Sequence, residues 1–209
     1  MSSKSASAYR IQVRADERPC ADLRTLQAGD ECLLSGTVYT ARDATCARLL
    51  AELDQSGTLP YGLAGQILFF AGPTPACAGR VVGSIGPTTA ARMDEATVAL
   101  MDAGLNATIG KGRRSPAVAE ACQRTGGVYF GAVGGIAALL ARHVTVVEVV
   151  AYPELGTEAL MRLTLEGFPV FVATDSQGID WYQEAPQRFL AQIESQATPS
   201  STPMRKMVD

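Results

Sequence analysis

The chain has 209 residues, 47% of them hydrophobic, and a formal net charge of −3. This length and apolar content are sufficient for one domain with a sizeable core. The weakly acidic balance excludes the basic footprint of a nucleic-acid-binding protein and offers no attraction to an anionic membrane. The first residues lack the apolar core of a signal peptide, and no run approaches the ~18 apolar residues of a membrane span, so we expect a cytoplasmic protein.

The first half of the chain alternates between strand and helix patterns. Leu49, Leu50 and Leu53 fall on one face of a helix, which the turn-forming segment 57–60 ends. The apolar run at 66–71 indicates a buried strand. In chain order we expect a strand at 32–39, a helix at 42–55, strands at 66–71 and 80–85, a helix that follows Gly86-Pro87-Thr88-Thr89 and ends near 103, and a short strand at 108–109.

The second half continues this alternation and then becomes richer in strands. Ser115-Pro116 is a helix start, with serine as N-cap and proline at the first position, and Gly126-Gly127 ends that helix. The expected elements are then a strand at 128–133, a helix at 136–142, strands at 144–151, 160–165 and 170–174, and a turn at 177–178. The pattern predicts a mixed α/β domain from 8 to 195, between flexible tails at 1–7 and 196–209.

The five cysteines do not form the CxxC spacing of a zinc or self-contained iron–sulphur site. In a cytoplasmic chain such cysteines are more often buried small side chains than disulfides. We therefore expect no metal ligands in this chain, and the thiolates of any cluster must come from elsewhere. The cysteines are Cys20, Cys32, Cys46, Cys77 and Cys122.

Three stretches, 35–43, 83–94 and 110–115, combine glycine, hydroxyl and cationic residues. Each lies where a strand passes into a helix or loop, which is where α/β folds place ligands. Helix N-termini and close backbone approach favour anions, and Arg42, Arg92 and Lys111 can supply positive charge. The stretches together predict an anion site.

Each residue also has an ordinary structural interpretation. Thr88 and Thr89 can cap the helix that follows them. Arg92 and Lys111 can be solvated surface cations. The Gly110-Lys111 pair does not belong to a P-loop, because glycine rather than serine or threonine follows the lysine.

As a set, the three stretches resemble the signature runs of the class I (iron–sulphur) fumarase C-terminal domain. They read Ser-Gly-Thr-Val-Tyr-Thr-Ala-Arg-Asp at 35–43, Gly-Pro-Thr-Thr-Ala-Ala-Arg-Met-Asp at 86–94 and Gly-Lys-Gly-Arg-Arg-Ser at 110–115. Shorter runs match in the same order at 72–75, 133–135, 152–156 and 167–169, so the resemblance covers roughly 27–183. In two-chain members this domain is the β subunit of fumarate hydratase or L(+)-tartrate dehydratase.

The resemblance implies a swivelling β/β/α domain that closes over an α subunit. That partner is expected to hold a [4Fe–4S] cluster through three cysteines, with one iron open to substrate. The implied reaction is the reversible loss of water from a small 2-hydroxy dicarboxylate such as malate, giving fumarate. A homodimer or an α2β2 assembly is compatible with it.

The resemblance also assigns roles to individual residues. Thr88 is the expected base or proton relay, and Cys46 stands where the family commonly has a histidine, so any hydrogen bond from that imidazole is lost. A threonine hydroxyl is a poor base and needs an acidic neighbour. The implied catalytic residues are Thr88 and Asp43, and the implied substrate-binding residues are Arg42, Thr89, Arg92 and Lys111.

Three functions remain open from the sequence. The leading hypothesis is a fumarase β subunit, and the nearest alternative is an L(+)-tartrate dehydratase β subunit. A third is a non-catalytic swivelling carrier module, whose phosphohistidine could only be His143, the single histidine of the chain. The carrier hypothesis predicts phosphate on His143, whereas the enzyme hypotheses predict that Arg92 is needed for turnover.

Overall fold

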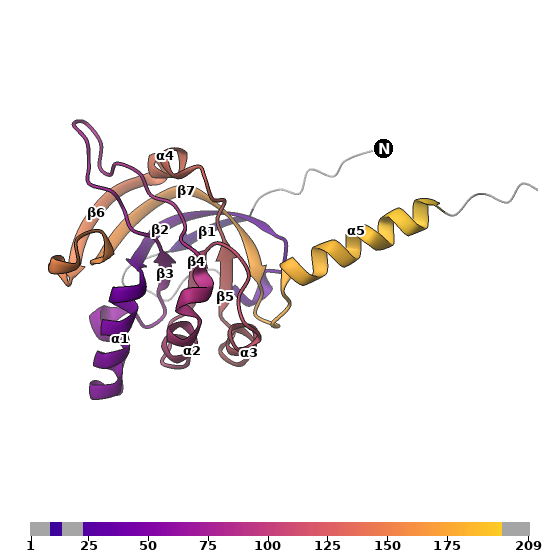
Figure 1. The fold of residues 1–209 in the computed structure, drawn as a ribbon, viewed down its shortest axis with the longest axis horizontal. Coiled ribbons are helices and arrows are strands. Elements are labelled where there is room, and N and C mark those ends of the chain that lie inside the picture. The colour runs from indigo at the N-terminus through magenta and orange to yellow at the C-terminus, as the bar shows by residue number, and fades with distance from the viewer. Residues whose placement is uncertain (1–8, 14–22, 198–209) are drawn as a thin grey trace, which may run out of the picture.

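Four consecutive strands run parallel through the centre of a computed structural model that describes residues 9–13 and 23–197 (Figure 1). They are β2 (Glu31–Ala41), β3 (Ile67–Phe70), β4 (Ala107–Gly110) and β5 (Val128–Gly131). The connections carry α1 (Asp43–Ser56), α2 (Asp94–Asp102) and α3 (Pro116–Thr125), which lie together on one side of the sheet. The predicted alternation of strand and helix is confirmed.

A long antiparallel strand, β7 (Leu160–Thr174), pairs with both outer members of this parallel set. Its first part pairs with β2 and its last part with β5, so that β2, β3, β4, β5 and β7 form a closed ring of pairings. Strand β6 (Val144–Ala151) extends the sheet beyond β7, and β1 (Tyr9–Val13) pairs with β2. Within the described residues, these strands make one seven-stranded sheet.

Side chains of the central strands alternate between two apolar clusters. Ile67 and Phe69 point into a cluster enclosed mainly by strands, whereas Leu68 and Phe70 pack against α1 and α2 on the other face. Both faces of the parallel strands are therefore buried, which explains their nearly continuous apolar sequences. Burial on both sides fixes the register, because a shift by one residue would exchange the two faces.

The helix ends follow local signals. Gly57 ends α1 and Gly126 ends α3, each in the left-handed conformation that favours glycine. The remaining short helices are η1 (Leu23–Thr25), η2 (Pro60–Gly62), η3 (Ala90–Met93), α4 (Ala137–Leu140), η4 (Ala141–His143) and η5 (Pro153–Glu158).

Two predictions about strands were wrong. Residues 80–85 form no strand: they belong to a loop in which Thr74 and Ser84 pair, and Val82 and Ile85 are buried because the loop covers the core. The strands expected at 160–165 and 170–174 are one strand. A bulge admits Gly167, whose N–H donates to Ser35 Oγ at 2.9 Å, so pairing continues through the segment expected to break it.

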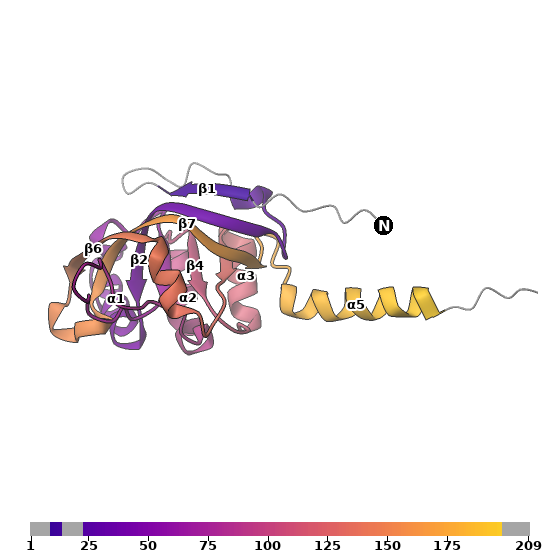
Figure 2. The same cartoon turned by 90° about the horizontal axis from the view of Figure 1, so that it is seen from above.

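The C-terminal helix α5 (Trp181–Ala197) and strand β1 were not predicted. Helix α5 extends away from the rest of the domain in both views (Figures 1 and 2), with Phe189, Leu190 and Ile193 exposed. It continues past the predicted domain end at 195. The expected N-terminal tail at 1–7 lies outside the described residues, and so does the part of the expected C-terminal tail from 198 to 209. No helix in the described part is long and apolar enough to span a membrane.

Candidate active site

The candidate residues meet at the carboxyl ends of the parallel strands. Arg42 directly follows β2 and Lys111 directly follows β4. Thr88 arrives from the long loop after β3, where its N–H donates to the Phe70 carbonyl (2.8 Å) and its carbonyl accepts from the Lys111 N–H (3.2 Å). The N–H of Ala90 in turn donates to the Lys111 carbonyl (3.0 Å), so backbone pairing joins the second stretch to the third.

Arg92 links the hydroxyl of Thr88 to the carboxylate of Asp43. Its Nη2 donates to Thr88 Oγ1 at 2.6 Å and lies 3.1 Å from Asp43 Oδ2. Arg92 and Asp43 are about half exposed, at 46% and 45%, so the pair faces the open edge of the sheet. Arg92 is therefore not simply a solvated helix residue, and Thr88 does not act as a side-chain cap. Thr89 stands at the N-cap position of η3 without a capping side-chain bond, and is exposed.

Arg42 is held beside the start of α1 by a carboxylate that the sequence did not indicate. Glu158 Oε1 lies 3.5 Å from Arg42 Nη2, and Glu158 Oε2 accepts the backbone N–H of Ala44 at 2.9 Å. The carboxylate thus caps the α1 N-terminus and pairs with the arginine there. Arg42 Nε is buried and has no hydrogen-bond partner among the residues that the structure describes, so one donor here is unsatisfied.

Glu158 reaches this place because η5 is attached to α1. Arg48 Nη2 donates to Glu154 Oε1 at 2.8 Å, and the Tyr152 hydroxyl donates to Glu52 Oε1 at 2.7 Å. Burial, followed by the bond to Glu52, raises the pKa of Tyr152, so this phenol stays protonated as a donor. The segment at 152–156, which carried part of the family resemblance, therefore positions Glu158.

Gly72 leaves room for the Arg42 side chain. A Cβ at position 72 would lie 3.0 Å from Arg42 Cδ and 3.1 Å from the Thr157 carbonyl oxygen. A larger side chain at this position would therefore crowd the arginine where it passes Thr157. Ala71, the preceding residue, pairs with Pro87 in an isolated bridge, which places the Arg42 and Thr88 segments side by side.

Lys111 contributes a cation with no carboxylate beside it. Its side chain is half-buried and passes Gly134, and across the part of the chain that the structure describes its ammonium has no ion-pair or hydrogen-bond partner. Arg42 and Arg92 are each matched by one carboxylate. The site consequently keeps an unbalanced positive charge, which suits an anionic ligand.

The end of the second stretch is tied to the third by a buried ion pair. Arg114 Nε donates to Asp94 Oδ1 (2.6 Å) and its Nη2 to Thr97 Oγ1 (2.6 Å), while the Ser115 N–H donates to Asp94 Oδ2 (2.7 Å). The guanidinium also lies over the Tyr129 ring, 4.7 Å from its centroid. Arg114 and Asp94 therefore hold the loop that presents Lys111, a role the sequence did not predict for them.

Cys46, at the place of the family's usual histidine, is buried between α1 and the sheet. Burial, together with the carboxylates of Asp43 and Glu158, raises the pKa of its thiol to about 12. Cys46 is thus a neutral thiol and no ionic substitute for an imidazole. Burial similarly raises the pKa values of Cys32 and Cys122 to about 12.

The only histidine has a structural contact outside this set of residues. His143 Nδ1 lies 2.9 Å from the Glu166 carbonyl, and its ring packs edge-on against Phe168 at 6.1 Å. Within the described ranges, no group of three or more His, Cys, Asp or Glu side chains could hold a metal ion. Cys20 lies outside those ranges.

Comparisons with known proteins agree with the sequence resemblance. Residues 1–185 match the family model described as Fumarase C-terminus. Over 153 residues the chain is 40% identical to "Fumarate hydratase class I, anaerobic" of Escherichia coli K12, covering 72% of this chain and 28% of that protein. The chain thus spans little more than a quarter of the length of this relative.

Other relatives have nearly the length of this chain. The "Putative L(+)-tartrate dehydratase subunit beta" of Methanocaldococcus jannaschii is 37% identical over 169 residues, which cover 78% of this chain and 87% of that protein. The "L(+)-tartrate dehydratase subunit beta" of Escherichia coli K12 is 35% identical over 162 residues, or 75% and 79% of the two chains. Since the family model matches most of the sequence, the chain belongs to the fumarase C-terminus family.

Proposed function

We propose that this chain is the β subunit of a class I-type hydro-lyase that interconverts fumarate and malate together with an α subunit. The central support is the group of cations formed by Arg42, Arg92 and Lys111, in which Arg92 donates to Thr88 and Lys111 has no carboxylate partner in the described ranges. The relative named as a β subunit, matched over 87% of its length, supports a two-chain enzyme. An α2β2 assembly would supply both halves of the site.

The ring of strands with helices on one side agrees with a swivelling β/β/α domain. In our proposal the carboxyl ends of the parallel strands face the partner. The candidate residues all lie at these ends, so closure of the domain would bring them onto a substrate held by the α subunit. This arrangement would also exclude water from the reacting groups.

The binding roles follow from charge and geometry. Arg42 has an unsatisfied buried N–H, and an arginine can hold a carboxylate through two parallel hydrogen bonds. Lys111 adds a flexible point charge for the second carboxylate, and the exposed hydroxyl of Thr89 can donate to it. Holding both carboxylates of the substrate would orient its carbon skeleton for proton transfer.

Thr88 is the group we assign to proton transfer. The bond from Arg92 occupies one lone pair of the Thr88 oxygen and stabilises negative charge there, so the hydroxyl proton is oriented away from Arg92. In the hydration direction Thr88 would give its hydroxyl proton to the carbon beside a carboxylate, and solvent would return a proton to the alkoxide that Arg92 stabilises. In dehydration Thr88 would first pass its own proton to solvent, and the resulting alkoxide would then receive the proton from carbon. Asp43 holds Arg92 in position and balances its charge.

The four thiols in the described residues do not fit as ligands of a [4Fe–4S] cluster. Cys32, Cys46 and Cys122 are buried and protonated, and Cys77 is exposed with no second thiol beside it among the described residues. Cluster ligands are thiolates. We therefore assign the cluster to the α subunit, where iron would act as a Lewis acid on the leaving hydroxyl.

The role of Thr88 is tested by comparing variants that remove or keep its hydroxyl in the reconstituted αβ complex. Thr88→Val should lower kcat by about 100-fold or more, the usual contribution of proton transfer, whereas Thr88→Ser should retain most activity. Arg92→Ala should also be strongly impaired. Arg124→Ala is the control, because the Arg124–Asp102 pair is equally exposed (51% and 45%) but lies at the far end of α3. A Thr88→Val complex with wild-type kcat would contradict this role.

An L(+)-tartrate dehydratase β subunit is the second candidate, favoured by the two relatives of similar length. It would use the same cations on a dihydroxy acid. Rates for malate, fumarate and L(+)-tartrate in the same anaerobic complex separate the two. Turnover of tartrate alone would replace the fumarase proposal.

A further inference from the structure

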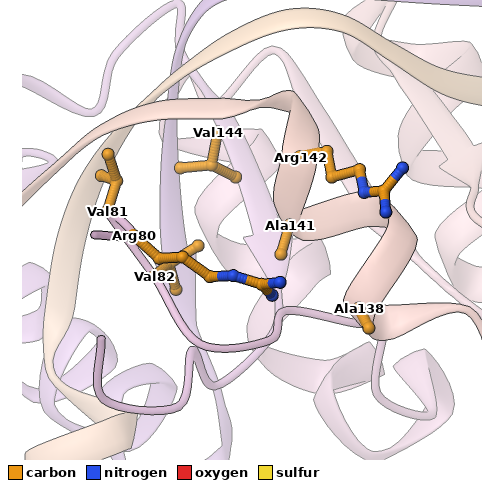
Figure 3. A pocket seen from close by; sticks show the side chains of 7 residues that line it. All are labelled: Arg80, Val81, Val82, Ala138, Ala141, Arg142 and Val144. Carbon is orange, nitrogen blue, oxygen red and sulfur yellow. The ribbon is translucent and has the colours of Figure 1, made fainter. Parts of the chain in front are cut away.

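A second cationic hollow lies apart from the candidate active site. It is a cavity of about 290 Å³ between the loop that contains Arg80 and the helical turn that contains Arg142 (Figure 3). None of Arg42, Thr88 and Lys111 lines it. Its lining consists of Arg80, Val81, Val82, Ala138, Ala141, Arg142 and Val144.

The two arginines of this cavity are not paired with any acidic side chain of the described residues. No carboxylate is among the lining residues, and in the portion of the chain that is described neither the Arg80 nor the Arg142 guanidinium has an ion-pair or hydrogen-bond partner. In the candidate active site, by contrast, Arg42 and Arg92 each have a carboxylate beside them. Two unpaired guanidiniums around one cavity, in a chain of net charge −3, create a local preference for an anion.

The floor of the cavity is apolar. Val82, Ala141 and Val144 are at most 9% exposed and belong to the strand-enclosed core. Figure 3 shows Arg80 extending over Val82 toward Ala141, with Arg142 on the helical side. A ligand must therefore present anionic groups to the rim and carbon to the floor.

We propose that this cavity binds a short aliphatic dicarboxylate, each arginine holding one carboxylate and the methylene chain lying over the apolar floor. The volume is near the lower limit of about 300–1,000 Å³ for ligand pockets, which favours a small acid over a nucleotide. Arginine pairs with carboxylates through parallel hydrogen bonds. Free phosphate would satisfy the cations but leave the apolar floor uncovered.

The helix beside the cavity contacts the loop that leads to Thr88. The Ile85 N–H donates to the Ala137 carbonyl at 3.2 Å, and a Cβ at Gly86 would lie 2.9 Å from the Ala137 Cβ. Gly86 thus allows the loop to lie against α4, two residues before Thr88. A dicarboxylate that joins Arg80 to Arg142 draws this loop and helix together, so binding should slow amide hydrogen exchange at Ile85.

Methyl NMR of the full chain, labelled at valine and alanine, tests the proposal with adipate as the probe. The Val82, Ala138, Ala141 and Val144 methyl signals should shift saturably. Arg80→Gln and Arg142→Gln, both on exposed side chains, should each weaken binding by about tenfold or more. Arg124→Gln makes the same change of charge elsewhere and should leave the affinity unaltered.

Several results would overturn the proposal. These are the absence of saturable cavity shifts, unchanged affinity in both cavity variants, or equally tight binding of inorganic phosphate. Valerate, with a single carboxylate, should bind at least about tenfold more weakly than adipate if both arginines are engaged. Lys111→Gln should leave the cavity shifts intact, so this test is independent of the proposed hydro-lyase activity.

Discussion

Two Arg–Asp pairs join α2 to the two ends of α3, and they differ mainly in burial. Arg114 and Asp94 are 2% and 16% exposed, with Nε and Oδ1 2.6 Å apart, whereas Arg124 and Asp102 are 51% and 45% exposed at 2.7 Å. The same residue types therefore occur in a desolvated and a solvated setting. We predict that Asp94→Asn is much more destabilising than Asp102→Asn.

The magnitude follows from what remains buried. In Asp94→Asn one amide oxygen must serve both the Arg114 Nε–H and the Ser115 N–H, so one donor loses its acceptor and the guanidinium loses its counter-charge. Breaking a buried pair by removing one partner costs about 3–5 kcal/mol. The exposed Asp102 pair should contribute less than about 1 kcal/mol, because water and salt screen it.

Urea denaturation of the three proteins under identical conditions measures the difference. The free energy of unfolding should fall by about 3 kcal/mol or more in Asp94→Asn, with little change in Asp102→Asn. The double variant Asp94→Asn with Arg114→Met removes both charges. Its loss of unfolding free energy should therefore be smaller than the losses of Asp94→Asn and Arg114→Met added together. Equal, small losses in the two single variants would refute the view that the buried pair holds the Lys111 loop.

Three further perturbations test other parts of the site. Glu158→Gln removes the counter-charge of Arg42 and weakens the cap on the Ala44 N–H, so it should cost about 1 kcal/mol in urea denaturation and raise the KM for the dicarboxylate; an unchanged KM would contradict the pairing. Gly72→Ala should displace Arg42 and raise KM more than it lowers stability, and an unaltered KM would mean that the arginine is not needed there. Because the pKa of Cys46 rises from 9.0 to about 12 on folding, the folded chain retains a proton that the unfolded chain loses. Stability should therefore fall between pH 9 and 12, by about 1.4 kcal/mol per pH unit for this thiol. In Cys46→Ala that slope, measured by urea denaturation at several pH values, should be shallower by this amount; an identical slope would show that Cys46 does not contribute.

Much of the parallel part of the fold could be predicted from local patterns. The helical spacing of Leu49, Leu50 and Leu53 predicted α1, and Ser115-Pro116 marked the start of α3 at the correct residue. The loop at 80–85 was mistaken for a strand because a loop over the core buries the same apolar side chains as a strand does. Pairing partners, which distinguish the two, are distant in sequence.

Within the site, the cations were predicted and their neighbours were not. Arg42, Arg92 and Lys111 stood in recognisable glycine-rich stretches, and the structure brings them to one edge of the sheet. Glu158 carried no comparable signal beyond its position shortly after the run at 152–156. Arg114 was part of a noted stretch, but its burial depends on the packing of Tyr129 over it.

Short-range chemistry in the sequence was enough to determine the parallel strands from β2 to β5, the helices α1, α2 and α3 between them, the turns that end α1 and α3, and the family. Those features depend on residues a few positions apart, such as a capping residue, a glycine in a left-handed turn or a period of 3.6. Only the tertiary structure decided which charges are paired. The Glu158 carboxylate accepts the N–H of Ala44, which is 114 residues away in the sequence. The two residues lie close together because β7 pairs with β2 in one register. Electrostatic partners are set by spatial position, which the sheet register determines and local sequence does not encode.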